Sequence, residues 1–158
     1  MLRIVKAVLR IYCIHCTGIL AICLSMYFSG LDLPLAFLYL AVIWQEARHN
    51  SSLYGPIRQG ILGFIWQLPA IFLSLSILLG LDRATDFSYY FIFILQLWHT
   101  PVLPIISLLP LHSIGDKPLY YYLLFLMVPL LWSFYLLPRD KRGRTCFVTH
   151  ERPTKRDA

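Results

Sequence analysis

Long apolar stretches separated by short polar links run through the whole chain. They are residues 11–29, 33–44, 61–81, 87–111 and 119–137. A helix rises about 1.5 Å per residue, so about 20 residues cross a hydrocarbon core of about 30 Å. The first, third and fifth stretches have that length, and in lipid only a helix pairs all of their backbone polar groups. The pattern predicts an all-α fold, a polytopic integral membrane helical bundle with about five hydrophobic helical segments, of which four or five cross.

The polar links contain residues that start or interrupt helices. Asp32 followed by Pro34 indicates a helix start, with the carboxylate capping free N–H groups and the proline in the first turn. Gly55-Pro56 punctuates the longest link, residues 45–60. We therefore expect helices on both sides of each link and a loop over residues 45–60.

Composition supports a membrane location and excludes several other classes. The apolar set makes up 58% of the 158 residues and charged residues only 14%, against about 45–50% and about 25% in average globular domains. A disordered chain would be poor in aliphatic and aromatic residues, and four cysteines do not make a disulfide framework. We expect a single transmembrane helical domain, residues 1–138, followed by a basic, loosely ordered C-terminal tail, residues 139–158.

Basic residues concentrate at the two ends of the chain. Residues 1–10 carry three Lys and Arg residues, and residues 139–158 carry seven of the 14 in the chain. Nucleic-acid binding needs a basic patch on a folded face, whereas these bases flank hydrophobic stretches, as in the positive-inside rule. We therefore expect a lipid bilayer and no nucleic acid as partner, a plasma-membrane location, and a C-terminal tail in the cytoplasm.

The positive-inside rule also limits the number of crossings. Five crossings with the N-terminus inside would leave six Lys and Arg residues inside and eight outside. If the second stretch, residues 33–44, stays outside, the distribution becomes eleven inside to three outside; if the fourth, residues 87–111, is re-entrant, it becomes twelve to two. The second stretch is short enough for a half-span, and Pro101, Pro104 and Pro110 interrupt the fourth. We expect an even number of crossings; five crossings with a translocated tail are the third alternative.

A polar turn near the middle of the fourth stretch is the main candidate for chemistry. Gln96, His99 and Thr100 share one helix face by their three- and four-residue spacing. An ionisable residue at that depth suggests a functional site, and a histidine can relay protons; alternatively, the three groups satisfy one another in a dry interface. Gln67 precedes Pro69 in the third stretch, and such kinked helices occur in transporters and in ordinary bundles. The candidate intramembrane polar site is Gln67, Gln96, His99 and Thr100.

Small side chains recur every four residues along the first stretch. Cys13, Thr17, Ala21, Ser25 and Ser29 form a slowly winding ridge, because four residues turn a helix by about 400°. Such ridges let helices approach closely in membranes. We favour packing against another helix of the same chain, and the alternative is an oligomer or partner interface. The candidate helix-packing face is Thr17, Ala21, Ser25 and Ser29.

Two short motifs have part of the spacing of a metal or redox site. The CxxC motif at residues 13–16 has no other cysteine nearby in sequence, and a structural zinc needs four ligands, while His15 points elsewhere on the helix. Glu46 and His49 have the spacing of one half of a carboxylate-bridged metal site, and the second half is missing. We interpret the segment of Glu46 and His49 as an interfacial helix end. The sequence predicts no catalytic residue, no metal and no cofactor.

A cluster of bases directly follows the fifth stretch. Near an anionic leaflet each base contributes about 1 kcal/mol of attraction, so the cluster anchors the helix end to anionic lipid headgroups. This membrane-surface basic cluster is Arg139, Lys141, Arg142 and Arg144.

These patterns favour a small multi-pass membrane protein that is not an enzyme. Its role would be that of a membrane subunit or accessory protein, packed against a membrane protein partner or a second copy of itself. The alternative is a channel- or transporter-like protein that uses the polar turn beside proline-broken helices. A lipid-active membrane enzyme is the second alternative, although the sequence has no paired carboxylates or Ser/His/Asp group to support it.

Overall fold

The chain folds into helices over nearly all of the residues that the computed structural model describes. These residues are 2–28, 30–80, 88–109, 113–114 and 117–137. The helices are α1 (Leu2–Ser25), α2 (Asp32–Leu53), α3 (Pro56–Leu78), α4 (Ser88–His99), the 3-10 helix η2 (Thr100–Val102), α5 (Leu103–Ile106) and α6 (Leu119–Leu136). Two short strands, β1 (Ser113–Ile114) and β2 (Lys117–Pro118), pair antiparallel. The predicted helical fold is confirmed, apart from this two-residue ladder.

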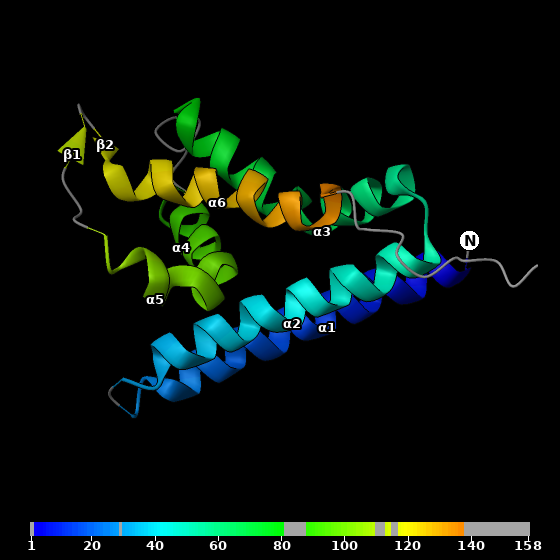
Figure 1. Ribbon diagram of the computed structural model, residues 1–158. Coiled ribbons are helices and arrows are strands. Elements are labelled where there is room, and N and C mark those ends of the chain that lie inside the picture. Colours follow the sequence, from blue (N-terminus) through cyan, green and yellow to red (C-terminus); the bar gives the residue numbers. More distant parts are fainter. Residues whose placement is uncertain (1, 29, 81–87, 110–112, 115–116, 138–158) are drawn as a thin grey trace, which may run out of the picture.

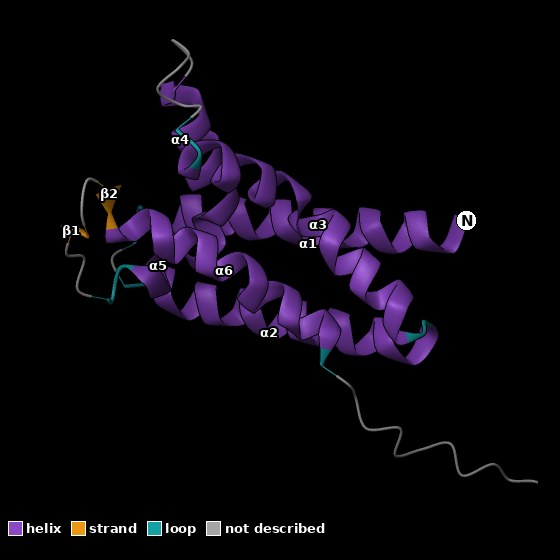
Figure 2. Ribbon diagram, turned by 90° about the horizontal axis from the view of Figure 1, so that it is seen from above, coloured by secondary structure: helices purple, strands orange, loops and turns teal. Residues whose placement is uncertain are grey.

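The helices form two layers with a broken segment between them (Figure 1). α1 and α2 make one layer, an antiparallel hairpin, and α3 and α6 lie side by side in the other, as the view from above also shows (Figure 2). α4 and α5 lie between the layers, in the half of the bundle away from the N-terminus. The start of α1, the end of α2, the start of α3 and the end of α6 therefore meet at one end of the molecule.

A glycine allows the close approach of α3 and α6. A Cβ atom at Gly63 would come within 2.8 Å of Trp132 Cδ1 and 2.9 Å of Tyr135 Cβ, so only glycine fits there without a shift of α6. One turn earlier, Trp132 Nε1 donates a hydrogen bond to the carbonyl oxygen of Gly60 at 3.0 Å. These contacts fix the register of the second layer.

Three helical segments are long and apolar enough to cross a membrane by length and composition. They are Ile4–Ser25, Pro56–Leu78 and Tyr89–Ile106, and Tyr122–Leu136 is a shorter apolar helix. Large apolar side chains also cover the outside of the bundle, among them Phe37, Phe72 and Phe93, each more than half exposed. An apolar exterior around a helical bundle is compatible with a lipid environment.

The second helix is longer than the sequence predicted. We expected an apolar element over residues 33–44 and a loop over residues 45–60, but α2 continues to Leu53 and only Tyr54 and Gly55 separate it from α3. The prediction failed because the polar residues of this half find partners inside the bundle, which their sequence alone does not reveal. Pro56 stands in the first turn of α3, as the Gly-Pro signal indicated.

The start of α2 also differs in detail from the prediction. The helix begins at Asp32 with Pro34 in its first turn, but the N-cap residue is Leu31 and no side chain caps the free N–H groups. The predicted capping role of Asp32 is therefore wrong. Its carboxylate instead lies in the first turn, where a negative charge favours the positive end of the helix dipole.

Proline has different effects in different helices. Pro69 and Pro129 lie inside α3 and α6, which continue through them. In the fourth stretch the α-helix ends at His99, and η2 and α5 follow with Pro101 and Pro104 near their starts. The predicted interruption of the fourth stretch is thus confirmed. The prolines lack the backbone N–H that would continue the hydrogen bonds of α4, so the α-helix ends before them.

Several predicted features lie outside the described residues. These are Ser29 of the small-residue ridge, Pro110, the boundary of the domain at residue 138, and the whole tail with Arg139, Lys141, Arg142 and Arg144.

Candidate functional site

A histidine on the inner face of α1 lies at the centre of the bundle. His15 is only 2% exposed, and its Nδ1 lies 2.7 Å from the hydroxyl of Tyr39 on α2. Its ring packs against the tilted ring of Trp98 of α4 with ring centroids 4.3 Å apart, and Trp66 of α3 meets it edge-on at 5.8 Å. Three other helices therefore hold this one imidazole in place.

The position of His15 follows from the apolar pattern of α1. Ile11, Ile22 and Ala7 are buried on the same helix, four, seven and eight residues from His15. On α2, Ala36 and Ile43 flank Tyr39 in the same way. Helical residues spaced in this manner share one face, so both polar residues face the core.

A second buried histidine comes from the end of α4. His99 is 1% exposed, and its Nδ1 lies 2.9 Å from the carbonyl oxygen of Leu95 one turn earlier. A carbonyl can only accept, so Nδ1 carries the proton in this bond and Nε2 of the neutral ring is an acceptor. The preceding residue, Trp98, packs against the His15 ring, so both histidines belong to the same region of the core.

Both histidines keep one ring nitrogen unused. His15 Nε2 and His99 Nε2 are buried and have no hydrogen-bond partner among the described residues, although the backbone of Trp98 lies close to the His15 ring. Gln67 on α3 is 1% exposed, and neither atom of its amide has a partner there. A buried polar atom without a partner costs about 1–3 kcal/mol. We call His15, Tyr39 and His99 the central polar cluster, and Gln67 is a further buried polar residue of α3.

The structure separates the four residues of the predicted polar site. His99 and Gln67 are fully buried, whereas Gln96 and Thr100 are half-buried. The hydroxyl of Thr100 donates to the carbonyl oxygen of Gln96 at 3.1 Å, which is a local bond to the preceding helical turn. No hydrogen bond joins Gln67 to His99 among the described residues, since the amide of Gln67 is unpartnered.

Sequence reasoning missed His15 and Tyr39. It considered His15 only as part of the CxxC motif and placed it on an unrelated face of the helix, whereas the structure places it in the core. The three cysteines that the structure describes, Cys13, Cys16 and Cys23, are free and exposed. Within the described ranges no three His, Cys, Asp or Glu residues gather as metal ligands. The spacing of His15 from Ile11 and Ile22 was the signal that could have found it.

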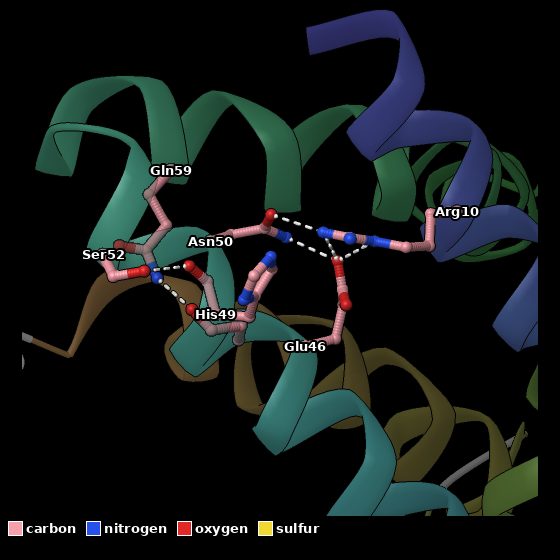
Figure 3. Close-up of polar contacts among 7 residues, drawn as sticks. Arg10, Glu46, His49, Asn50, Ser52 and Gln59 are labelled. Atoms are coloured by element: carbon pink, nitrogen blue, oxygen red, sulfur yellow. Dashed lines mark hydrogen bonds and ion pairs between the residues drawn. The ribbon is translucent and has the colours of Figure 1, made fainter. Parts of the chain in front are cut away.

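A second polar cluster lies between the first half of α1 and the second half of α2 (Figure 3). Arg10 Nε donates to Glu46 Oε1 at 2.7 Å, and Arg10 Nη2 lies 2.6 Å from the same oxygen. Asn50 accepts a bond from Arg10 Nη2 at 3.1 Å and donates one to Glu46 Oε1 at 2.9 Å. Gln59 of α3 donates to the carbonyl oxygen of Ala47 at 3.0 Å and ties the next helix to this end. We call Arg10, Glu46 and Asn50 the terminal polar cluster.

The terminal polar cluster gives Glu46 partners inside the bundle, and the interfacial position of this helix end stays a prediction. Glu46 is 8% exposed and Asn50 is fully buried, and only His49 points to the outside. Glu46 meets a guanidinium and an amide rather than water. The Glu46 carboxylate, whose spacing from His49 is that of half a metal site, therefore forms an ion pair that joins α1 to α2.

The ridge of small residues on α1 divides between the core and a groove. Ser25 is buried and donates to the carbonyl oxygen of Ile22, while Ala21 is half-buried and Thr17 is exposed. Thr17 and Ala21 line a groove of about 320 Å³ between α1 and α2. The ridge thus adjoins another helix of the same chain, although it is not fully covered by it.

Comparison of the chain with models of protein families, with curated proteins and with solved structures found no match.

Proposed function

We propose that this chain is a small multi-pass membrane protein of the channel- or transporter-like kind, and that its central polar cluster takes part in passing protons or a small polar solute. One observation carries the proposal: His15 of α1 and His99 of α4 are both buried, and neither His15 Nε2 nor His99 Nε2 has a hydrogen-bond partner among the described residues. Ionisable residues inside membrane bundles are costly and commonly mark proton or ion pathways. The neutral imidazole can accept a proton at one nitrogen and release one at the other.

The position of the helix break supports this role. α4 ends at His99, and η2 packs against α1, where Pro101 Cγ lies 3.5 Å from the Cβ position of Gly18. Transport proteins build their sites near the midplane from interrupted helices. In this chain the interruption and the two histidines coincide.

We propose four crossings, by α1, α2, α3 and α6. The bent segment α4–η2–α5 would be re-entrant, because it occupies only the half of the bundle away from the N-terminus (Figure 1). In α2 the apolar half would lie in the bilayer, and the half with the terminal polar cluster would reach its surface. This arrangement agrees with the short apolar stretch of residues 33–44.

The charge distribution supports a cytoplasmic location for both ends of the chain. Lys6, Arg10, Arg48 and Arg58 lie on helix segments that meet at the end of the bundle where α1 begins and α6 ends. Positive residues stay on the cytoplasmic side, which for the plasma membrane would put the tail in the cytoplasm. Reporter fusions to both termini test this, and opposite locations of the two ends would contradict four crossings.

Proton flux into vesicles tests the function. We expect the purified protein in liposomes to dissipate an imposed pH gradient, and His99→Asn to abolish this while keeping an amide N–H for the Leu95 carbonyl. The matched control is His49→Ala, which removes an exposed histidine from α2 outside the cluster. Wild-type vesicles that hold the gradient as well as empty ones, or equal flux in His99→Asn, would overturn the proton role.

A second candidate is a membrane subunit or accessory protein, and the partly open ridge on α1 favours it. Thr17 and Ala21 line the groove, and α2 does not bury them completely, so a partner helix could contact them. Ala21→Leu tests this role, whereas Ser25→Leu would disturb the chain itself because Ser25 is buried. An unchanged size of the native complex in Ala21→Leu would contradict it. The lipid-active enzyme stays a prediction to which we assign no residues.

A further inference from the structure

The groove between α1 and α2 changes from apolar to polar along its length. Cys13, Thr17 and Ala21 of α1 form one wall, and Leu35, Leu38 and Val42 of α2 form the other. Arg10 lies at one end of the groove. It also lines an adjoining hollow of about 270 Å³ together with Gln45, Glu46 and His49. Ile14 and Val42 line both hollows, so the two are adjacent.

The length of the groove fits one leaflet. From Arg10 to Ala21 the helix rises about 17 Å at 1.5 Å per residue, which is close to half of a hydrocarbon core of about 30 Å. A transmembrane helix from a partner would need a groove through both leaflets. A single acyl chain needs only this depth.

Arg10 has the capacity to bind a further anion. Its side chain is 44% exposed, and its bonds to Glu46 and Asn50 use Nε and Nη2. Nη1 has no hydrogen-bond partner among the described residues, and guanidinium N–H groups suit phosphate oxygens. Lys6 lies one turn earlier and shares a further hollow, of about 390 Å³, with Arg10.

The charge of this end favours an anionic ligand. Lys6, Arg10, Arg48 and Arg58 lie at the same end of the bundle as Glu46, the acidic partner of Arg10. The charge balance is therefore positive where the apolar groove opens. Charge complementarity and leaflet depth together select a molecule with an anionic head and an apolar tail.

The geometry points to a binding site for one anionic glycerophospholipid in the α1–α2 groove, with its phosphate at Arg10 and one acyl chain between Thr17, Ala21 and Leu38. The site is separate from the central polar cluster and from the basic tail. It rests on the membrane location proposed above, and lipid retention can fail independently of that location.

Competition between two lipids tests the site. Delipidated protein in detergent is offered equal amounts of dioleoyl phosphatidylglycerol and dioleoyl phosphatidylcholine, and native mass spectrometry counts the lipids retained. We expect one phosphatidylglycerol per chain, held about ten-fold more strongly than phosphatidylcholine, a difference of about 1.4 kcal/mol. Equal retention of the two lipids would overturn the proposal.

Paired variants separate the groove from general lipid adhesion. Ala21→Leu fills the groove and should reduce retention about ten-fold, whereas Ala41→Leu makes the same change on α2 at an exposed position outside the groove and should not. The double variant Arg10→Gln/Glu46→Gln removes the cation without leaving a buried carboxylate, and should abolish the preference for the anionic lipid. Arg58→Gln removes a charge at the same end and should keep it.

Other outcomes would identify a different occupant or a different location. A larger complex in wild type that Ala21→Leu dissociates, with lipid retention unchanged, would show a helix-docking surface instead and overturn the proposal. Equal retention in Ala21→Leu and Ala41→Leu would also overturn it. Extraction of the wild-type protein from membranes by alkaline carbonate would contradict the membrane location itself, and is measured separately.

Discussion

The two polar clusters both contain residues of α1 and α2, but their hydrogen bonding differs. In the terminal polar cluster Glu46 Oε1 accepts bonds from both Arg10 and Asn50, and Asn50 uses both its oxygen and its nitrogen. In the central polar cluster His15 and His99 each use one nitrogen and leave the other without a partner. His15 follows Arg10 by only five positions along α1. Depth below the membrane surface therefore does not by itself explain why the two clusters differ in hydrogen bonding.

This contrast separates a structural role from a functional one. A buried network in which every polar atom is hydrogen-bonded fixes how two helices pack. A buried network with unpaired polar atoms lowers the free energy of unfolding, and such destabilisation is typical of functional sites. The terminal polar cluster therefore joins the helices, and the unpaired nitrogens of the central one are the basis of the role proposed for it.

The largest effect is expected from breaking the ion pair of the terminal polar cluster. Arg10→Leu leaves the Glu46 carboxylate, 9% exposed, without its cation, and should lower the free energy of unfolding by about 3 kcal/mol, the low end for a buried pair because Arg10 is partly solvated. Denaturant unfolding in detergent measures this. The double variant Arg10→Leu/Glu46→Leu should recover most of the loss, and failure to do so would indicate that packing, not charge, dominates.

A smaller effect is expected where the two helices approach each other beside the central polar cluster. A Cβ atom at Gly18 would lie 2.6 Å from Tyr39 Cδ2, so Gly18→Ala should push the tyrosine ring away from His15 and cost about 2 kcal/mol. Gly55→Ala is the control, because a Cβ there meets nothing within 4 Å. Equal unfolding curves for the two variants would contradict the tight contact.

Removing an unsatisfied group should increase stability. Gln67→Met keeps a long side chain in the core of α3 but removes two buried polar atoms without partners, and should raise the free energy of unfolding by about 1 kcal/mol. The same variant should reduce proton flux. Lower stability would mean that Gln67 has partners, such as water, in the folded protein.

The smallest effect is expected from the single hydrogen bond of His15. Tyr39→Phe removes the hydroxyl that lies 2.7 Å from His15 Nδ1, and should cost about 0.6 kcal/mol, the average for such bonds in membrane bundles. Denaturant unfolding together with vesicle flux checks it. A loss as large as that of Arg10→Leu would remove the distinction between the two clusters.

Local patterns predicted the elements better than the site. The apolar stretches gave α1, α3 and α6, and the prolines gave the break after His99, because each signal lies within one helix. The second half of α2 was missed because its burial depends on Arg10, 36 residues earlier in the chain. No periodicity within residues 45–53 carries that information.

The candidate site was predicted only in part for the same reason. His99 and Gln67 were identified because an isolated polar residue in an apolar stretch is visible in the sequence. His15 was not, since its neighbouring cysteines offered another explanation, and its partners Tyr39 and Trp98 come from other helices. Tertiary packing, and not helix propensity, brings these residues together.

The hydrogen bond between Trp132 and Gly60 spans 72 residues and has a consequence for the order of assembly. The α1–α2 hairpin can close as soon as its own residues leave the ribosome, since its contacts are between neighbours in the chain. Gly60 and Gly63 of α3 pack against residues of α6, so these contacts can form only after α6 is synthesised. A nascent chain that stops before α6 therefore lacks Trp132 and Tyr135, the residues that cover Gly63.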